Sequence, residues 1–160
     1  MTVSQGGPAP EATVHELGDA GPKAVSTKDL FAGRKVAVFG LPGAFTRTCS
    51  SKHLPGFVQN AAALKAKGID DILCVSVNDA FVMDAWGKEH GAPGKVRMIG
   101  DGNADLTKAL GVDRDASANG MGVRSKRYSM IVDNGVVKVF NLEPTGEYGI
   151  SSAEHMLTQV

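Results

Sequence analysis

The sequence predicts an α/β fold in which a mixed central sheet is flanked by helices. Apolar strand segments alternate with helical segments over most of the chain, and parallel strands require helical crossovers of this kind. Near the C-terminus, two apolar segments flank Asp133-Asn134-Gly135, a strong signal for an antiparallel hairpin. The length of 160 residues and the hydrophobic content of 42% suit one packed core, so we expect residues 1–160 to form a single domain with an N-terminal extension.

The first half of the chain supplies strands that are followed by helices. Alternation favours an edge strand over residues 12–17, and Ser26 can cap a single helical turn that Gly33 ends. The pattern then predicts, in order, a strand at 35–39, a helix at 47–67 interrupted at Pro55-Gly56, a strand at 71–77, and a helix from Asn78-Asp79 to about His90. In that last helix we expect an apolar face formed by Phe81, Val82, Ala85 and Trp86.

The second half adds further strands and the hairpin. The pattern predicts a strand at 96–99, a short helix at 104–110, a polar loop at 113–126, hairpin strands at 128–132 and 136–140, and a final helix capped near Ser151 or Ser152. The thioredoxin-like fold fits this order. A flavodoxin-like sheet, as in a flavin-binding module, is the main rival, but a wholly parallel sheet would not be expected to finish with an Asn-Gly hairpin.

Charge and hydropathy exclude several classes of function. Lys plus Arg and Asp plus Glu both total 17, and no basic stripe is present, so we expect neither nucleic acid nor a membrane as a partner. No apolar run approaches the length of a membrane span. The histidines are scattered, and the glycines at 40–43 lack the pattern of a nucleotide loop, so we expect no metal and no cofactor.

The cysteine content and the N-terminus bear on the compartment. Cys49 and Cys74 are too few for a disulfide framework and suit a reducing environment. Residues 1–10 contain no basic residue followed by an apolar core, as a secretory signal would, and the first arginine is Arg34. We therefore expect a cytoplasmic protein, while an organellar location after removal of a transit peptide stays open.

Cys49 is the candidate functional residue. It follows an apolar strand and a Pro-Gly turn at the start of a helix, where unpaired N–H groups and the helix dipole stabilise an anion such as a thiolate. In open α/β sheets, chemistry gathers at the carboxyl ends of the strands, where such loops lie. The run Cys49-Ser50-Ser51-Lys52 lacks the second cysteine of a Cys-x-x-Cys motif, so ordinary dithiol exchange is not expected.

The residues around Cys49 carry a specific family pattern. Pro42-x-x-x-Thr46-x-x-Cys49 resembles the active-site motif of the peroxiredoxins. The type II, or peroxiredoxin V-like, subfamily is matched further by His53-Leu54-Pro55-Gly56-Phe57, by Val75-Ser76-Val77-Asn78-Asp79 with Phe81-Val82-Met83 and Trp86, and by Arg124-Ser125-Lys126-Arg127-Tyr128-Ser129-Met130. The resemblance runs from about residue 10 to the end of the chain. It implies a thiol peroxidase in which Cys49 attacks hydrogen peroxide or an alkyl hydroperoxide and becomes a sulfenic acid.

The resemblance also implies roles for the neighbours of Cys49. Arg127 matches the active-site arginine, which brings a permanent positive charge to the sulfur and to the leaving oxygen. Thr46 would orient a peroxide oxygen through its hydroxyl, and Pro42 would shield the pocket. We expect Arg124 to lie next to the residues that contact the peroxide rather than to contact it. The alternatives without a catalytic role are a buried core cysteine, a threonine that only caps the helix, and a solvated cluster of basic side chains.

Two residues near Cys49 have open roles. His53 lies one helical turn after Cys49, where it could tune the thiol or only pack in the helix, and packing is the favoured interpretation. Arg47 stands where the family usually has a proline. It therefore loosens the first helical turn and adds a cation two residues from Cys49, which either stabilises the thiolate or points to solvent.

The second half of the reaction cycle depends on Cys74. The same spacing from Cys49 occurs in plant type II members, but Cys74 lies mid-strand, roughly 10 Å below the rim of the site at about 3.3 Å per residue. A disulfide needs Cα atoms within roughly 7 Å, so pairing would require local unfolding. Residues 149–152 contain no thiol that could replace it. We therefore expect an external reductant, either glutathione with glutaredoxin or thioredoxin.

The resemblance implies a homodimer packed near the active-site loops, where the apolar Phe45 could serve as a contact. A non-enzymatic redox sensor or holdase that uses oxidised Cys49 is the competing function. Continuous turnover of peroxide with a thiol reductant distinguishes the enzyme from the sensor.

Overall fold

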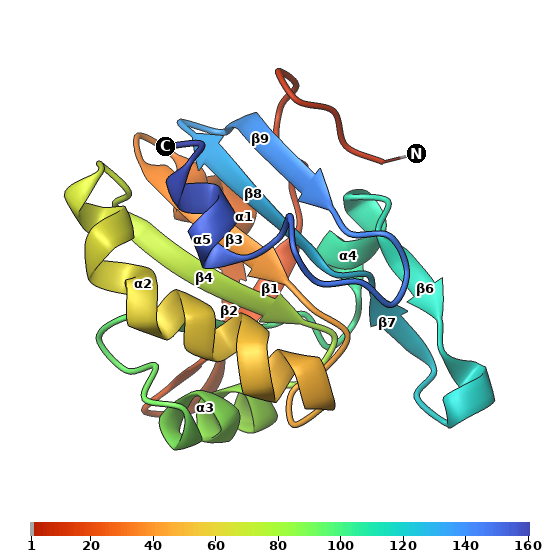
Figure 1. Cartoon of the computed structure of the whole chain (residues 1–160). Coiled ribbons are helices and arrows are strands. Elements are labelled where there is room, and N and C mark those ends of the chain that lie inside the picture. Colours follow the sequence, from red (N-terminus) through yellow and green to blue (C-terminus); the bar gives the residue numbers. More distant parts are fainter. Residues whose placement is uncertain (1) are drawn as a thin grey trace.

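The computed structural model describes residues 2–160, which form a mixed seven-stranded sheet with helices on both faces (Figure 1). The strands lie in the order β2-β1-β5-β4-β3-β8-β9, and β3, β4 and β5 are parallel to one another. Their bounds are β1 Thr13–Gly18, β2 Gly21–Ser26, β3 Lys35–Gly40, β4 Asp71–Ser76, β5 Arg97–Gly100, β8 Tyr128–Asp133 and β9 Val136–Leu142.

Helices cover the sheet in two layers, each with its own apolar core. On one face lie α2 (Leu54–Ala66), α3 (Ala80–Glu89) and α5 (Ala153–Leu157), and on the other lie α1 (Thr27–Phe31) and α4 (Asp105–Ala109). Because successive side chains of a strand point to opposite faces, Phe39 packs in the first core and its neighbour Val38 in the second. Cys49 and Cys74 both belong to the first core.

At one edge of the sheet the expected hairpin is confirmed, and at the other edge a strand was missed. Asn134 and Gly135 both have positive φ, at 47° and 80°, which is the geometry expected of the tight turn between β8 and β9. At the opposite edge, the expected strand at 12–17 is β1, but it is not an edge strand. The edge is β2, which sequence reasoning missed because none of its residues is buried and its side chains show no clear alternation of apolar and polar types.

The segment expected to be a polar loop at 113–126 contains regular structure. Asp113–Asp115 (β6) and Val123–Ser125 (β7) form a separate antiparallel ribbon, with a 3₁₀ turn at Ser117–Asn119 between them. Strands of three residues are too short for alternation to be visible in the sequence. The ribbon holds residues 114 and 124 opposite each other, beside the end of the sheet where β3 stops.

The helix expected at 47–67 is continuous across Pro55-Gly56, and the irregular turn comes one turn earlier. Residues Cys49–His53 form a π-helical turn in which the N–H of Leu54 donates to the Cys49 carbonyl, and α2 follows directly. Pro55 has no N–H to donate to the carbonyl four residues before it, and the wider turn accommodates this loss. The proline therefore shapes the turn that contains Cys49.

Helix α3 buries only part of the face expected: Trp86 lies in the core and the partly buried Val82 packs against it. Phe81 is 59% exposed and Ala85 is exposed, whereas Met83 and Trp86 lie in the core together with Ala80 and Gly87. Asp79 caps the helix by accepting from the Val82 N–H at 2.9 Å, as expected. Among residues 2–160, no helix combines the length and apolar character needed to cross a bilayer.

Candidate active site

Strand pairing brings the two ends of the candidate site together. β3 ends at Gly40, which lies opposite Tyr128 at the start of β8. A Cβ at position 40 would lie 2.0 Å from the Tyr128 ring, so only glycine allows this close approach. Arg127 directly precedes Tyr128 and therefore lies beside the loop that leads from β3 to Cys49.

The sulfur of Cys49 contacts a permanent cation. Arg127 donates from Nη2 to Cys49 Sγ at 3.1 Å, and the Cys49 side chain is fully buried. Ser50 N–H donates to the Thr46 carbonyl, so Cys49 belongs to the first turn of its helix, where backbone N–H groups lack helical partners. A charged donor and a helix start both stabilise an anionic sulfur.

His53 holds the other side of the Arg127 guanidinium. Its Nδ1 accepts from Arg127 Nη1 at 2.8 Å and its Nε2 donates to the Ser151 carbonyl at 2.9 Å, an assignment that follows because arginine only donates and a carbonyl only accepts. Burial, and then the charge of Arg127, lower the pKa of His53 to about 3. The imidazole is therefore neutral. His53 therefore contacts Arg127 and not Cys49. It orients the arginine that contacts the sulfur, in addition to packing in the helix.

This network is completed by Glu143, Tyr148 and Ser151, which sequence reasoning did not select as site residues. The Glu143 carboxylate accepts from the Ser151 hydroxyl at 2.7 Å and from the Ser151 N–H at 2.9 Å, which fixes the carbonyl that His53 meets. Burial alone would raise the pKa of Glu143, but these hydrogen bonds and one from Gly149 outweigh it and lower the pKa. The ring of Tyr148 lies 5.9 Å from the Arg127 guanidinium carbon, within range of a cation–π contact.

Thr46 lies in a strained loop beside Cys49. Its hydroxyl donates to the Gly43 carbonyl at 2.7 Å rather than capping the helix, so its oxygen lone pairs remain able to accept a hydrogen bond. The preceding residue, Phe45, has φ 64°, a left-handed conformation that costs a non-glycine residue about 1–2 kcal/mol. Asn78 supports this loop by accepting from the Ala44 N–H at 3.0 Å. Asn78 is thus a loop anchor and not part of the helix cap.

Arg124 packs against the loop at Pro42 and Gly43. Arg124 donates from Nε to the Met121 carbonyl at 3.0 Å and from Nη1 to the Pro42 carbonyl at 3.4 Å. A Cβ at Gly43 would lie 2.7 Å from Arg124 Nη1, so this packing also requires glycine. Arg47 is exposed and makes no side-chain hydrogen bond or ion pair within residues 2–160. Of the two alternatives for Arg47, its side chain takes the solvent-facing one.

Comparison with known proteins places this geometry in a family. The redoxin family matches residues 4–157. Peroxiredoxin-2E-2, chloroplastic, from Oryza sativa subsp. japonica is 52% identical over 161 residues, which cover 98% of this chain and 72% of the rice protein. The chain belongs to the peroxiredoxin family. Its resemblance to the type II subfamily is confirmed by this match, and as a peroxiredoxin it is a thiol peroxidase, an oxidoreductase.

Solved structures agree with the peroxiredoxin fold. The crystal structure of reduced Prx3 from Vibrio vulnificus in complex with H₂O₂ has a TM-score of 0.95 at 47% identity, with 99% of each chain covered. A structure from Burkholderia cenocepacia, provisionally named a thioredoxin reductase, has a TM-score of 0.97 at 48% identity and covers 100% of this chain and 99% of that one. The expected thioredoxin-like fold is confirmed, and the flavodoxin-like alternative is wrong.

The second cysteine of this peroxiredoxin is poorly placed to react. Cys74 is fully buried in β4, where Phe39 and Met98 are its neighbours on the adjoining strands. Burial, and then the nearby Cys49, raise the pKa of the Cys74 thiol well above its ordinary value. A protonated, enclosed thiol is a poor nucleophile. Both cysteines are free thiols in the structure.

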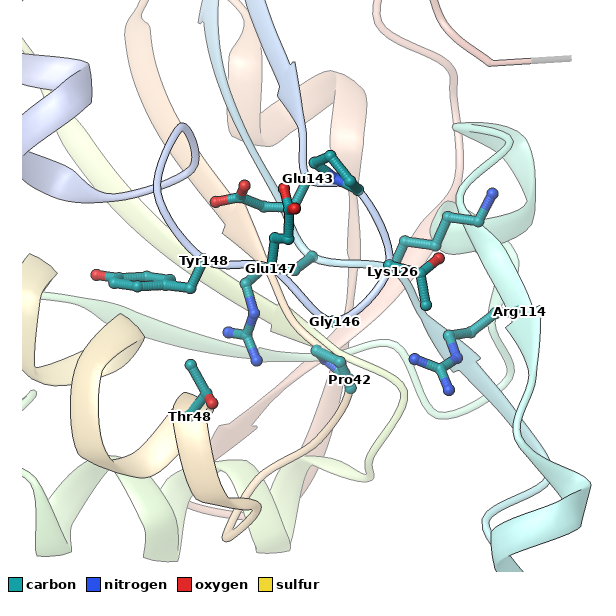
Figure 2. Close-up of a pocket in the computed structure, with 11 residues that line it drawn as sticks. Pro42, Thr48, Arg114, Lys126, Glu143, Gly146, Glu147 and Tyr148 are labelled. Carbon is teal, nitrogen blue, oxygen red and sulfur yellow. The ribbon is translucent and has the colours of Figure 1, made fainter.

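A cavity of about 120 Å³ opens beside the site of this peroxiredoxin (Figure 2). Arg127 is among the residues that line it, and Figure 2 shows Arg114 and Lys126 on the side away from Thr48. Thr48 directly precedes Cys49, so the cavity leads to the helical turn that carries the sulfur. No group of three or more His, Cys, Asp or Glu side chains within residues 2–160 could hold a metal ion.

Proposed function

We propose that Cys49 is the peroxidatic cysteine of this enzyme and that it reduces hydrogen peroxide and alkyl hydroperoxides. The observation that carries the proposal is the 3.1 Å contact between Arg127 Nη2 and Cys49 Sγ. The Cys49 thiolate attacks one peroxide oxygen, an S–O bond forms and the O–O bond breaks. The leaving oxygen takes a proton and departs as water or an alcohol, and Cys49 becomes a sulfenic acid.

The neighbours of Cys49 act on the peroxide rather than on the sulfur alone. Arg127 stabilises charge that develops on the leaving oxygen, because its guanidinium remains protonated and its direction is fixed by His53. Thr46 accepts a hydrogen bond from the peroxide O–H through the lone pairs left by its bond to Gly43. Pro42 shields the pocket, and Arg124 keeps the Pro42 carbonyl in place. The complex of the related Vibrio vulnificus Prx3 with H₂O₂ supports hydrogen peroxide as a substrate.

We propose a cycle with one reacting cysteine in each chain. The burial and raised pKa of Cys74 argue against its attack on the Cys49 sulfenic acid. An external thiol, glutathione with glutaredoxin or else thioredoxin, then reduces Cys49. Such a cycle suits a reducing compartment, either the cytoplasm or an organelle, because both cysteines are unpaired thiols.

Steady-state consumption of peroxide tests this function. Wild type, Cys49→Ser and Cys74→Ser are each assayed with the glutathione–glutaredoxin and thioredoxin systems. We expect loss of turnover only in Cys49→Ser. Continuous turnover by the wild type would also exclude the sensor or holdase, which would react once. Full activity of Cys49→Ser would refute the mechanism, and a monomeric Cys49–Cys74 disulfide as the main product, seen by intact mass, would refute the one-cysteine cycle.

We also propose a homodimer that packs through the surface beside the active-site loop. Phe45 and Phe81 are 56% and 59% exposed, and the Phe45 ring lies 6.4 Å from that of Trp86 on the helix that carries Phe81. Exposed aromatic side chains of this size are typical of subunit contacts. Sedimentation of the wild type and of Phe81→Glu measures the assembly. A wild type that is monomeric at micromolar concentration would contradict this proposal.

A further inference from the structure

Two basic side chains on the border of the cavity beside Arg127 form no ion pair with an acidic side chain in the part of the chain that the structure describes. Within residues 2–160, the half-buried side chains of Arg114 and Lys126 make no ion pair and no hydrogen bond of their own. Two carboxylates also reach the wall. Glu143 is bonded to the backbone and hydroxyl of the loop that follows it, and Glu147 is exposed to solvent. The free cations make this cavity suited to an anion.

The shape of the cavity limits what it can hold. Its volume of about 120 Å³ lies below the roughly 300 Å³ at which cavities for drug-sized ligands begin, so it accepts one end of a small molecule. Figure 2 shows Arg114 and Lys126 on one side, Thr48 on the other, and Pro42 between them. A ligand that places a carboxylate at the two cations therefore extends its other part toward Thr48 and Cys49.

We propose that this cavity binds a carboxylate of glutathione, a small acidic peptide with a thiol between two carboxylate ends. This inference rests on the proposed function, in which an external thiol resets Cys49. The glutathione sulfur attacks the sulfenic acid of Cys49, an S–S bond forms, and the S–O bond breaks with release of water. A second glutathione thiol attacks the mixed disulfide, which leaves Cys49 reduced and glutathione oxidised.

The burial of Cys49 adds a requirement to this step. Because its side chain is fully buried, the oxidised sulfur meets the bound thiol only when the turn that carries Thr48 and Cys49 moves toward the cavity. That turn is π-helical, so its backbone hydrogen bonds are less regular than those of the α-helix that follows. Basic side chains at the far end of the cavity hold the carboxylate while this movement occurs.

The test compares an acidic thiol with a neutral one in the same protein. Wild-type enzyme is oxidised with one equivalent of peroxide, and the second-order rate constants for loss of the sulfenic acid are measured with glutathione and with 2-mercaptoethanol. Two partly exposed cations each contribute a few-fold, so the ratio of the two constants falls about tenfold in Arg114→Glu/Lys126→Glu. The ratio in wild type also falls when salt shortens the range of electrostatic attraction. It stays constant in Lys138→Glu, a charge reversal at the exposed position of β9.

The outcomes separate this inference from the function on which it rests. A ratio equal to that of wild type in the double variant would overturn the glutathione site and leave the peroxidase intact. Failure of peroxide to oxidise Cys49 in wild type would refute the proposed function itself. Circular dichroism checks the fold of the double variant, and Arg114→Gln/Lys126→Gln provides the same comparison if the charge reversal prevents folding.

Discussion

Protonation of His53 should destabilise the folded enzyme in mild acid. Burial and Arg127 lower its pKa from 6.5 to about 3, a gap worth about 5 kcal/mol at 1.36 kcal/mol per pKa unit. The unfolded chain binds a proton at His53 once the pH falls below about 6.5, whereas the folded chain resists it. The contribution to stability is therefore complete above pH 6.5 and is lost progressively as the pH falls toward 3.

At pH 5 the expected loss relative to pH 7.5 is about 2 kcal/mol, a large share of the 5–15 kcal/mol that typically stabilises a domain. Urea unfolding followed by circular dichroism at both pH values measures it. His53→Gln is the matched variant, because its amide can accept from Arg127 and donate to the Ser151 carbonyl but does not titrate. Other titrating groups contribute to both proteins alike. Equal pH dependence in wild type and His53→Gln would refute the reasoning.

Three further predictions concern the loop and the arginine. Arg127→Lys should slow the reaction with peroxide by about 10- to 100-fold, because an ammonium lacks the planar fork through which the guanidinium contacts Cys49 and His53 at once; a rate within twofold of wild type, in single-turnover assays, would contradict this. Asn78→Ala should lower the same rate and destabilise the fold by about 1–2 kcal/mol, while Asp79→Ala, which removes only a helix cap, should lower stability alone. Arg47→Pro should leave the peroxide rate unchanged and raise the free energy of unfolding by about 0.4–1 kcal/mol, since the side chain is exposed; a tenfold rate change would assign it a role at the sulfur.

Local signals explain which parts of the fold were predictable. The Asn134-Gly135 turn, the Ser26 cap and the strand that ends at Gly40 depend on residues close together in the chain, and each was expected. β2 was missed because none of its residues is buried and their pattern is irregular. The interruption expected at Pro55-Gly56 occurs instead one turn earlier, as the π turn at Cys49–His53, because a missing proline N–H acts on the residues before it.

In the candidate site, too, only the residues with a local sequence signal could be predicted. Thr46 and Cys49 share one short motif, and Arg127 could be selected because the hairpin start carries a family pattern. The contact of His53 with Ser151 joins residues 98 positions apart, and that of Arg127 with Cys49 joins residues 78 apart. No periodicity in the sequence encodes such pairs. Glu143 and Tyr148 lie in a loop with ordinary composition, so only the folded chain shows that they hold His53 and Arg127 in place.

The chain contains one tryptophan, and its position gives the enzyme an optical reporter. Trp86 donates from Nε1 to the Ser50 hydroxyl at 3.0 Å, one residue after Cys49, and its ring is fully buried. Any movement of that turn lengthens this bond and changes the surroundings of the indole. Intrinsic fluorescence can therefore follow oxidation and reduction of Cys49 in real time, without a label and without a coupled enzyme.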